Sequence, residues 1–139
     1  MLAGIDIGTT GCKITVYDNL GNYLFKAYQD YQTYRDNNLQ EIRPLDILNA
    51  AKKIIKEASS KYIIDAIGID SFGESFVMVD KNDNPLTNVI SYTDNRGSKQ
   101  IDDLIKLLGK EKIASITGLN PHCMYSLGKI LWLKENQKD

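Results

Sequence analysis

A short glycine- and threonine-rich segment near the N-terminus carries the residues best suited to chemistry. Gly8, Thr9, Thr10 and Gly11 separate two runs in which apolar and polar residues alternate, as expected of β-strands. Glycines permit backbone angles closed to other residues and leave main-chain N–H groups uncovered. Consecutive N–H groups in a turn form a concave site for an anion, most often phosphate. The sequence therefore predicts a phosphate-binding hairpin.

Two charged residues flank this turn. Asp6 lies near the end of the first run, where its carboxylate could hold a metal ion beside the phosphate, and Lys13 adds a cation just after the turn. The same residues also fit an ordinary hairpin, because glycine and aspartate are frequent turn formers. The segment is not a P-loop, because it lacks the G-x-x-x-x-G-K-[ST] pattern and precedes a strand rather than a helix.

Composition limits the class of protein. The 139 residues suit one domain, and 42% hydrophobic and 25% charged residues are typical of soluble globular proteins. The net charge of −1 gives no reason to expect nucleic acid or an acidic membrane as partner. The apolar runs are too short to span a bilayer, and we expect no signal peptide. Cys12 and Cys123 form no C-x-x-C pair, which favours reduced thiols in a cytoplasmic protein.

The pattern along the chain predicts an α/β fold. The two strands of the hairpin and a third over 23–31 indicate a three-stranded antiparallel meander. The polar segment 33–41 is predicted to be a loop, followed by an amphipathic helix over about 45–61. A short, largely apolar stretch over 63–70 is typical of a central strand. These elements predict a mixed sheet covered by helices.

The second half of the chain is predicted to continue in the same style. A strand over 76–80, a turn over 81–86 and a short edge strand over 88–91 come first. Helices are then expected over 98–108, over 110–116 and from 126 to about 136.

Four sequence blocks occur in series along nearly the whole chain. They are G-I-D-I-G-T-T-G-C-K-I-T-V-Y-D, G-I-D-S-F-G-E-S-F-V-M-V-D, P-L-T-N-V-I-S-Y-T-D-N-R-G and T-G-L-N-P-H-C-M-Y-S-L-G-K-I-L-W-L. In this order and spacing they resemble the N-terminal part of the FGGY family of carbohydrate kinases, which includes xylulose, glycerol and gluconate kinases.

The resemblance implies a fold and an activity. The fold would be ribonuclease-H-like, as in actin, hexokinase and the heat-shock ATPases. The activity would be phosphoryl transfer from ATP, with Mg²⁺, to a hydroxyl of a small sugar or polyol. Asp6 would lie near the Mg²⁺ and the transferring phosphate, as metal ligand and catalytic residue. The residues that would face the nucleotide are Gly8, Thr9, Thr10, Gly11 and Lys13.

The resemblance also implies a substrate side. Glu74 falls where relatives place a Glu or His that hydrogen-bonds substrate hydroxyls. Asp94 and Arg96 fall in a block that usually ends W-x-D-x-R, close to the substrate or supporting it. Arg96 could instead pair with Asp94 or a neighbouring carboxylate to shape the loop. Tyr92 stands where Trp is usual, and Gly73 stands where glycerol kinases have arginine, which counts against glycerol.

Length is the largest departure from the family. FGGY kinases are much longer, their catalytic base is an Asp further along the N-terminal domain, and a second domain holds most of the adenine. The resemblance therefore implies that residues 1–139 are part of an N-terminal domain and inactive alone. Two alternatives stay open: a non-catalytic actin-like domain that binds nucleotide or sugar without turnover, and a lobe that binds nothing alone. The sequence does not identify the sugar and leaves open whether the protein forms a homodimer.

Overall fold

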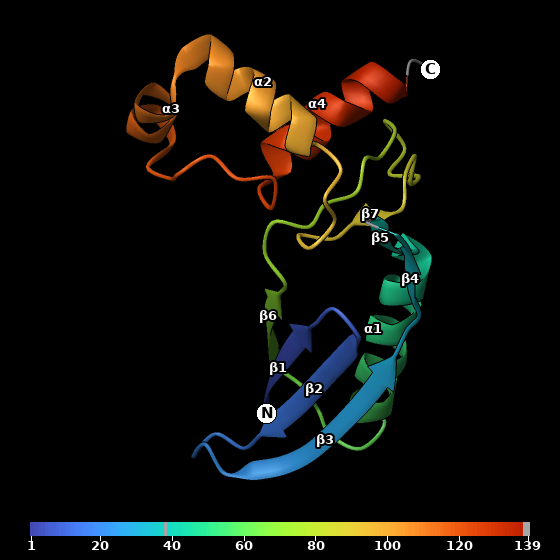
Figure 1. Ribbon diagram of the computed structural model, residues 1–139. Helices are drawn as coiled ribbons and strands as arrows, with labels where there is room; N and C mark the ends of the chain where they lie inside the picture. The colour runs from blue at the N-terminus through green and yellow to red at the C-terminus, as the bar shows by residue number, and fades with distance from the viewer. Residues whose placement is uncertain (38, 138–139) are drawn as a thin grey trace. The chain divides into compact units, whose positions relative to one another are not determined.

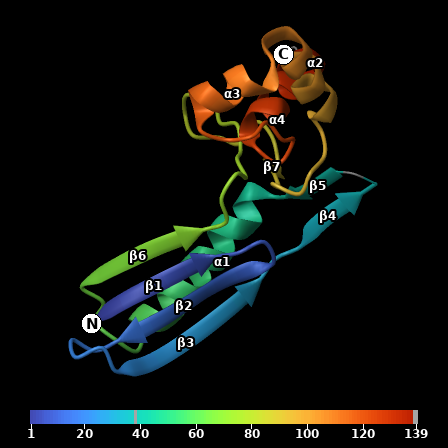
Figure 2. The same cartoon turned by 60° about the vertical axis from the view of Figure 1, so that its left-hand side comes forward.

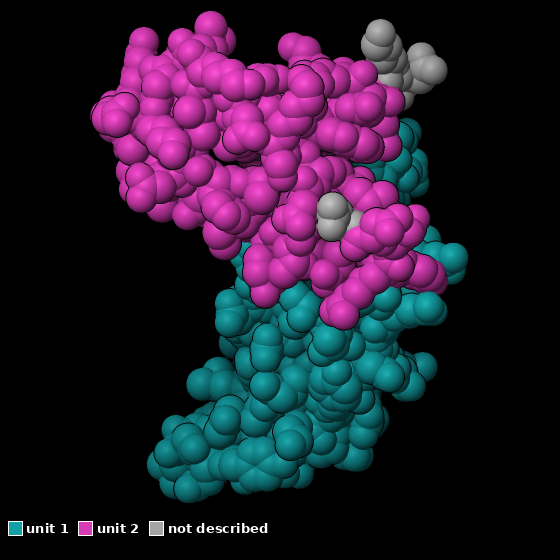
Figure 3. Space-filling view, viewed as in Figure 1, with its two compact units in different colours: residues 1–33, 42–73, 77–89 teal, residues 34–41, 74–76, 90–139 magenta. Residues whose placement is uncertain are grey.

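The computed structural model describes residues 1–37 and 39–137 of the chain. They form two compact units, drawn in different colours in Figure 3. Unit 1 comprises residues 1–33, 42–73 and 77–89, and unit 2 comprises residues 34–41, 74–76 and 90–139. The chain therefore passes between the two units several times.

Unit 1 is built on a four-stranded mixed sheet. Its strands are β1 (Leu2–Ile7), β2 (Gly11–Tyr17), β3 (Tyr23–Asp30) and β6 (Ala66–Ser71), in the order β3-β2-β1-β6. Strands β1, β2 and β3 are antiparallel neighbours, whereas β6 runs parallel to β1 (Figure 2). The predicted meander and the mixed sheet are both confirmed.

Helix α1 (Pro44–Ser59) covers one face of this sheet, as Figures 1 and 2 show. Its buried residues, Ala50, Ile54 and Ala58, recur at helical spacing, so that they form one stripe. The stripe packs on Ile5 and Ile14, which alternate with exposed residues along their strands. Burial of one isoleucine side chain contributes about 1.5–3 kcal/mol, so this layer supplies much of the stability of unit 1.

Strand β6 differs from its prediction. The stretch 63–70 was expected to give a central strand, but β6 lies at the end of the sheet and all six of its residues are exposed. Ile69 is 70% exposed. An apolar run predicts burial on both sides, yet among the described residues no strand pairs with the outer edge of β6. The prediction of a central strand is therefore wrong for the described chain.

Two turns of unit 1 share one hydrogen-bonding pattern. Asp18 Oδ1 accepts from the N–H groups of Leu20 and Asn22, at 2.8 and 2.9 Å, and its Oδ2 accepts from the Asn22 side chain. Asp80 makes the equivalent contacts two and four residues on, the latter with Asn84. Bonds from the Asn side chains are the largest effect lowering the pKa of Asp18 and of Asp80. The predicted turn over 81–86 is confirmed.

A second sheet has the strand order β4-β5-β7, with β4 (Thr33–Asp36), β5 (Leu39–Ile42) and β7 (Val89–Ile90). The prediction of a loop over 33–41 is therefore wrong, while residue 38 of that segment lies outside the described residues. Polar composition indicated a loop, but pairing with a strand far along the chain orders the segment, as in the bond from Ser91 N to Gln40 O at 3.0 Å. The predicted edge strand over 88–91 is confirmed by β7.

The segment 76–80 does not form the predicted strand. It makes only isolated bridges, Phe76 with Ile90 and Val79 with Pro85. Its run of apolar residues resembles a strand, but only single residues pair with it, so that no ladder forms.

Three helices complete unit 2 and confirm the predicted positions: α2 (Ser98–Leu108), α3 (Lys110–Thr117) and α4 (Ser126–Asn136). Helices α2 and α4 pack against each other (Figure 1). Gly97 precedes α2 with φ 90°, and Gly118 follows α3 with φ 74°. Across the described residues, we find no helix with the length and apolar character that crossing a membrane requires.

Candidate functional site

The turn between β1 and β2 has its carbonyl groups held from the β3 side. The N–H of Gly8 donates to Gly11 O at 2.9 Å and closes the turn. Three carbonyls of the turn accept from residues 28–33. The donors are Tyr31 Oη to Gly8 O, Thr33 Oγ1 to Thr9 O at 3.0 Å, and Tyr31 N and Tyr28 Oη to Thr10 O at 3.2 and 3.3 Å. Hydrogen bonds to these three carbonyl groups therefore fix the orientation of the turn.

Unlike the carbonyl groups, the main-chain N–H groups at the tip of the turn have no hydrogen-bond partner among the described residues. Within residues 1–37 and 39–137, no group accepts a hydrogen bond from the main-chain N–H of Thr9 or Thr10. Adjacent N–H groups without acceptors attract an anion, because their partial positive charges add. The geometry of the turn thus fits the phosphate-binding hairpin that the sequence predicts.

The two glycines of the turn are needed because a side chain would be crowded there, and not because of unusual backbone angles. Neither Gly8 nor Gly11 has a positive φ. A Cβ atom on Gly11 would instead lie 2.7 Å from the carbonyl oxygen of Gln29 and closer still to the hydroxyl of Tyr28. Gly11 is needed because β3 and its tyrosine pack directly against the turn.

Asp6 and Lys13 are paired neighbours on the open side of the sheet. They face each other across β1 and β2, and Lys13 Nζ donates to Asp6 Oδ2 at 3.0 Å. About half of each side chain is exposed, so this ion pair contributes about 0–1 kcal/mol and is readily rearranged. On the other side of β1, Asp70 pairs with Asp6 in register, and its Oδ1 accepts from its own neighbour, Ser71 N, at 2.9 Å.

The donor set fits magnesium bound together with phosphate. In the described part of the chain no three His, Cys, Asp or Glu residues lie close enough to hold a metal by themselves. Mg²⁺ is usually held by one or two carboxylates together with substrate phosphates and water. Asp6, beside free N–H groups suited to phosphate, offers this kind of incomplete site.

The cysteines are free thiols, as predicted. Cys12 lies buried directly after the turn, and Cys123 is partly buried in unit 2. Burial raises the pKa of the Cys12 thiol, so that it remains neutral and acts as a packing residue. Burial likewise raises the pKa of Tyr31, whose hydroxyl therefore stays a donor to the turn.

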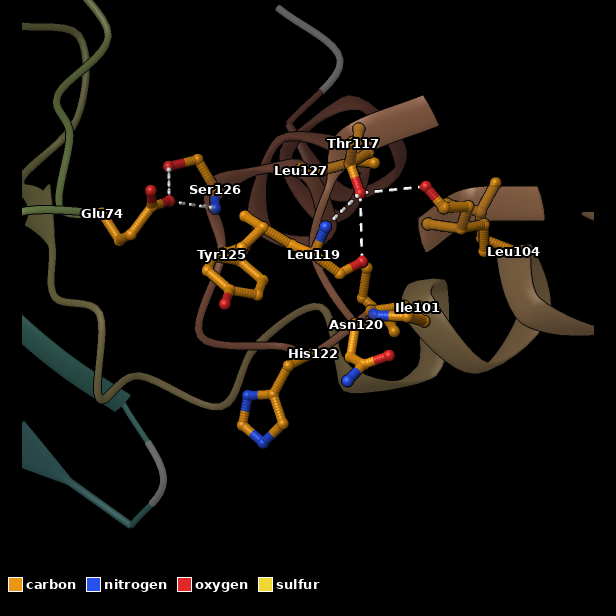
Figure 4. Close-up of a pocket in the computed structure, with 12 residues that line it drawn as sticks. Glu74, Ile101, Leu104, Thr117, Leu119, Asn120, His122, Tyr125, Ser126 and Leu127 are labelled. Carbon is orange, nitrogen blue, oxygen red and sulfur yellow. Dashed lines mark hydrogen bonds between the residues drawn. The ribbon is translucent and has the colours of Figure 1, made fainter. Parts of the chain in front are cut away.

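In unit 2, Glu74 is held in an unusual backbone conformation. Its φ is 57°, a left-handed value that costs most side chains about 1–2 kcal/mol. Its Oε2 accepts from both the N–H and the hydroxyl of Ser126, each at 3.2 Å, at the first turn of α4 (Figure 4). A carboxylate there is stabilised by the unpaired N–H groups and the dipole of the helix. Strain of this kind is often retained at functional sites.

A pocket of about 190 Å³ opens beside Glu74 within unit 2 (Figure 4). Its walls are largely aliphatic, with Ile101 and Leu104 from α2 and Ile113 from α3 among them. Polar groups come from Glu74 and from the segment that leads into α4. The pocket can thus accept a small molecule with one polar end.

Asp94 and Arg96 are buried and bound to each other. Asp94 is fully buried, and its Oδ1 accepts from the main-chain N and from Nε of Arg96, both at 2.9 Å. Its Oδ2 accepts from a terminal nitrogen of Arg96 at 2.8 Å and from Gln40 N at 2.7 Å. This is the pairing that the sequence left open as the alternative to direct substrate contact.

The surroundings of Arg96 complete this network. The same terminal nitrogen donates to Glu41 Oε1 at 2.6 Å, and the guanidinium lies 5.1 Å from the centre of the Trp132 ring. Burial by itself would lower the pKa of Arg96, but its bonds to Asp94 and Glu41 outweigh this effect and raise it. Sequence reasoning missed Glu41, because the segment around it read as a polar loop.

The predicted site residues fall into two groups. Residues 6–13 belong to unit 1, whereas Glu74, Asp94 and Arg96 belong to unit 2. Within unit 2, the ammonium of Lys129 interacts electrostatically with all three. Lys129 is a second residue that sequence reasoning missed, since nothing in the pattern distinguishes it from the other lysines of the helices.

Comparison with known proteins covers the whole chain. The model of the "FGGY family of carbohydrate kinases, N-terminal domain" matches residues 1–139. A gluconokinase of Bacillus subtilis is 31% identical over 143 residues, which cover 99% of this chain and 28% of that enzyme. Glycerol kinase 1 of Saccharolobus solfataricus is 34% identical over 139 residues, which cover 95% of this chain and 27% of that enzyme.

Solved structures agree with the sequence comparison. The crystal structure of gluconate kinase from Lactobacillus acidophilus superposes with a TM-score of 0.92 at 28% identity. The match covers 99% of this chain and 29% of that one. The chain therefore spans less than a third of the length of the relatives it matches, and the ribonuclease-H-like fold class implied by the sequence is confirmed.

Proposed function

Because this chain belongs to the FGGY family of carbohydrate kinases, we propose that it is part of the N-terminal domain of an ATP-dependent kinase. The kinase phosphorylates a hydroxyl group of a sugar or polyol. One observation carries the proposal: the turn at Thr9 and Thr10 presents N–H groups that no described residue accepts, beside the carboxylate of Asp6. This arrangement suits a polyphosphate with its metal ion.

Residues of unit 1 are proposed to bind and orient ATP, the phosphoryl donor. In our proposal the N–H groups of Thr9 and Thr10, and the turn formed by Gly8 and Gly11, receive the nucleotide phosphates. Mg²⁺, when bound with ATP, neutralises the charge that develops on the transferring phosphoryl group. Asp6 would hold this ion, and Lys13, released from its exposed pair with Asp6, would add a cation to the phosphates.

On the acceptor side, Glu74 is the side chain proposed to contact substrate. A carboxylate offers acceptors for neighbouring hydroxyl groups, which suits a polyol. Asp94 and Arg96 are proposed to support this site through the buried network that fixes their loop, since all four hydrogen bonds to Asp94 come from protein groups. No residue of this chain is assigned as the base that takes the proton of the hydroxyl.

The acceptor class stays broad in this proposal. The two curated relatives are named for gluconate and for glycerol, and they are about equally similar to this chain. The absence of an arginine at Gly73 argues against glycerol. We therefore place aldonates and ketoses before glycerol as acceptors.

The test is a coupled ADP-release assay of the full-length protein with Mg²⁺ and ATP. The panel should contain gluconate, pentuloses, hexuloses and glycerol. We expect ADP release that depends on one of the first three classes. ADP release independent of every acceptor, or none despite measurable nucleotide binding, would reject the kinase and leave a non-catalytic nucleotide-binding domain.

A further inference from the structure

Lys129, in the second turn of α4, is a fully buried lysine, and no carboxylate of residues 1–37 or 39–137 bonds to its ammonium group. Its Nζ donates instead to three main-chain carbonyls: Met124 O at 2.7 Å, Cys123 O at 3.0 Å and Tyr92 O at 3.4 Å. An ammonium group has three N–H donors, so these three acceptors match its capacity. Burial of such a cation is costly unless its donors are used in this way.

The three carbonyls belong to two separate loops of unit 2. Cys123 and Met124 lie in the segment that leads into α4, whereas Tyr92 lies in the loop between β7 and α2. Lys129 thus connects both loops to the helix at one point. No other described lysine is fully buried.

The same loops are joined a second time at Glu74. The N–H of Tyr92 donates to Ser75 Oγ at 3.0 Å, and Ser75 directly follows Glu74. Glu74 in turn accepts from Ser126 at the start of α4. These contacts form a closed ring that runs from Lys129 through Tyr92, Ser75 and Glu74 back to α4. A change at Lys129 should therefore alter the position of the strained turn at Glu74.

Burial and the nearby charged groups act on the ammonium of Lys129 in opposite directions. Burial lowers the pKa of its ammonium, while the negative charges of Asp94 and Glu74 act in the opposite direction. Cys123 also favours the charged form, and Arg96 opposes it. The ammonium therefore depends on its carbonyl partners and on these carboxylates to stay charged in the interior.

We propose that Lys129 is a positioning residue for the acceptor site: it holds the carbonyls of Tyr92, Cys123 and Met124 and thereby fixes the turn that presents Glu74. The role of Glu74 in acceptor binding rests on the proposed function. The role of Lys129 in ordering the two loops does not.

The experiment compares Lys129→Met and Lys129→Gln in the full-length protein with Lys134→Met, which removes an exposed lysine from the same helix. Methionine keeps an unbranched apolar side chain but donates nothing, whereas glutamine retains two donors. Hydrogen exchange of peptides covering residues 90–96 and 120–126 is measured first. We expect exchange in these peptides to be faster by about tenfold or more in Lys129→Met, less so in Lys129→Gln, and unchanged in Lys134→Met.

Kinetics provide the second readout. Lys129→Met should raise the KM for the acceptor by about tenfold or more, with the affinity for Mg-ATP unchanged, because the nucleotide residues lie in unit 1. A general loss of structure would instead weaken both. If Lys129→Met does not fold, Lys129→Gln serves the same purpose, together with the protection of the same peptides in the wild-type protein, measured against pH relative to the intrinsic exchange rate. Deprotonation of Lys129 should lower this protection.

The outcomes separate the two proposals. Unchanged exchange in both peptides of a folded Lys129→Met protein would overturn the positioning role, as would equal losses of acceptor and nucleotide affinity. Faster exchange in a protein without any acceptor-dependent turnover would support the role of Lys129 while rejecting the kinase.

Discussion

Gly97 and Gly128 lie in direct backbone contact between α2 and α4. A Cβ atom on Gly128 would be 2.9 Å from Gly97 O and 2.8 Å from Cγ1 of Ile101, and one on Gly97 would be 2.7 Å from Lys129 N. Two elements can approach this closely only where side chains are missing. The contact sets the position of Lys129 against the loop that contains Tyr92.

Gly128→Ala should therefore destabilise unit 2. Because the added methyl group meets main-chain atoms and a buried isoleucine, we expect a loss of about 1–3 kcal/mol, measured as a lower thermal midpoint of the full-length protein. Gly68→Ala is the matched control, since a Cβ at Gly68 has nothing within 4 Å. An equal loss in both variants would contradict the steric explanation.

Glu74→Gln distinguishes two roles of one carboxylate. Glutamine keeps an oxygen that can accept from Ser126, so the start of α4 should be retained. It loses the charge, so the KM for the acceptor should rise by about tenfold or more, as a charge-assisted hydrogen bond is lost. Steady-state kinetics of the full-length protein measure this, with Asp103→Asn, which removes an exposed carboxylate of α2, as the control. Unchanged kinetics in Glu74→Gln and Glu74→Ala would remove Glu74 from the acceptor site.

Asp6→Asn should weaken the binding of magnesium. If Asp6 holds the ion, its loss should lower the apparent affinity for Mg²⁺ or the activity by about 10–100-fold. A Mg²⁺ titration at saturating ATP, together with Mn²⁺ binding measured by electron paramagnetic resonance, tests this. Asp70→Asn, which changes the in-register neighbour on β6, is the control and should have little effect. Equal effects at both positions would indicate a general loss of negative charge.

Arg96→Met should be strongly destabilising. It leaves the fully buried carboxylate of Asp94 without its main partner, and breaking a buried ion pair in this way costs about 3–5 kcal/mol. The matched exposed pair is Lys99 with Asp103, and Lys99→Met should lower the stability far less, because water already solvates both groups. Thermal unfolding compares the two. Equal, small effects would show that the network around Asp94 contributes little to the fold.

The two aspartate turns should weaken in acid. Hydrogen bonds lower the pKa of Asp18 and Asp80 in the folded protein, so each carboxylate contributes stability above its unfolded pKa of about 3.9 and loses it as the pH falls through the lower, folded value. Asp80→Asn should therefore lose stability at neutral pH and show a smaller further loss in acid than the wild type. Thermal midpoints between pH 7 and pH 2 measure this, because the loss begins only near the unfolded pKa. Parallel curves for both proteins would exclude Asp80 as a source of the pH dependence.

The sequence predicted those elements whose pattern is local. Helices α2 and α4 repeat their apolar residues at helical spacing, and the meander alternates at the spacing of strands, so their positions were confirmed. Strands β4 and β5 were not predicted, because β4 pairs with β5 and β5 in turn pairs with β7 some 50 residues later along the chain, and neither pairing is evident from their polar composition. The apolar run of β6 indicated burial that no described partner provides.

The candidate site shows the same division. Glycines, threonines and an aspartate at short spacing identified the turn at residues 8–11, since all its members are close in sequence. Tyr31 and Thr33 donate hydrogen bonds to the carbonyls of that turn. These contacts depend on how the chain at the end of β3 returns to the turn, which no local sequence pattern predicts. The three carbonyl partners of Lys129 are equally non-local.

The outer edge of β6 has a row of main-chain donors and acceptors that no described strand pairs with, and Ile69 on this strand is 70% exposed. An unpaired edge strand of this kind can form hydrogen bonds with extended segments of other chains. Residues 1–139 prepared in isolation should therefore self-associate, and light scattering during purification would reveal it. Assemblies formed in that way would report on the unpaired edge of β6 and not on the oligomeric state of the full-length protein.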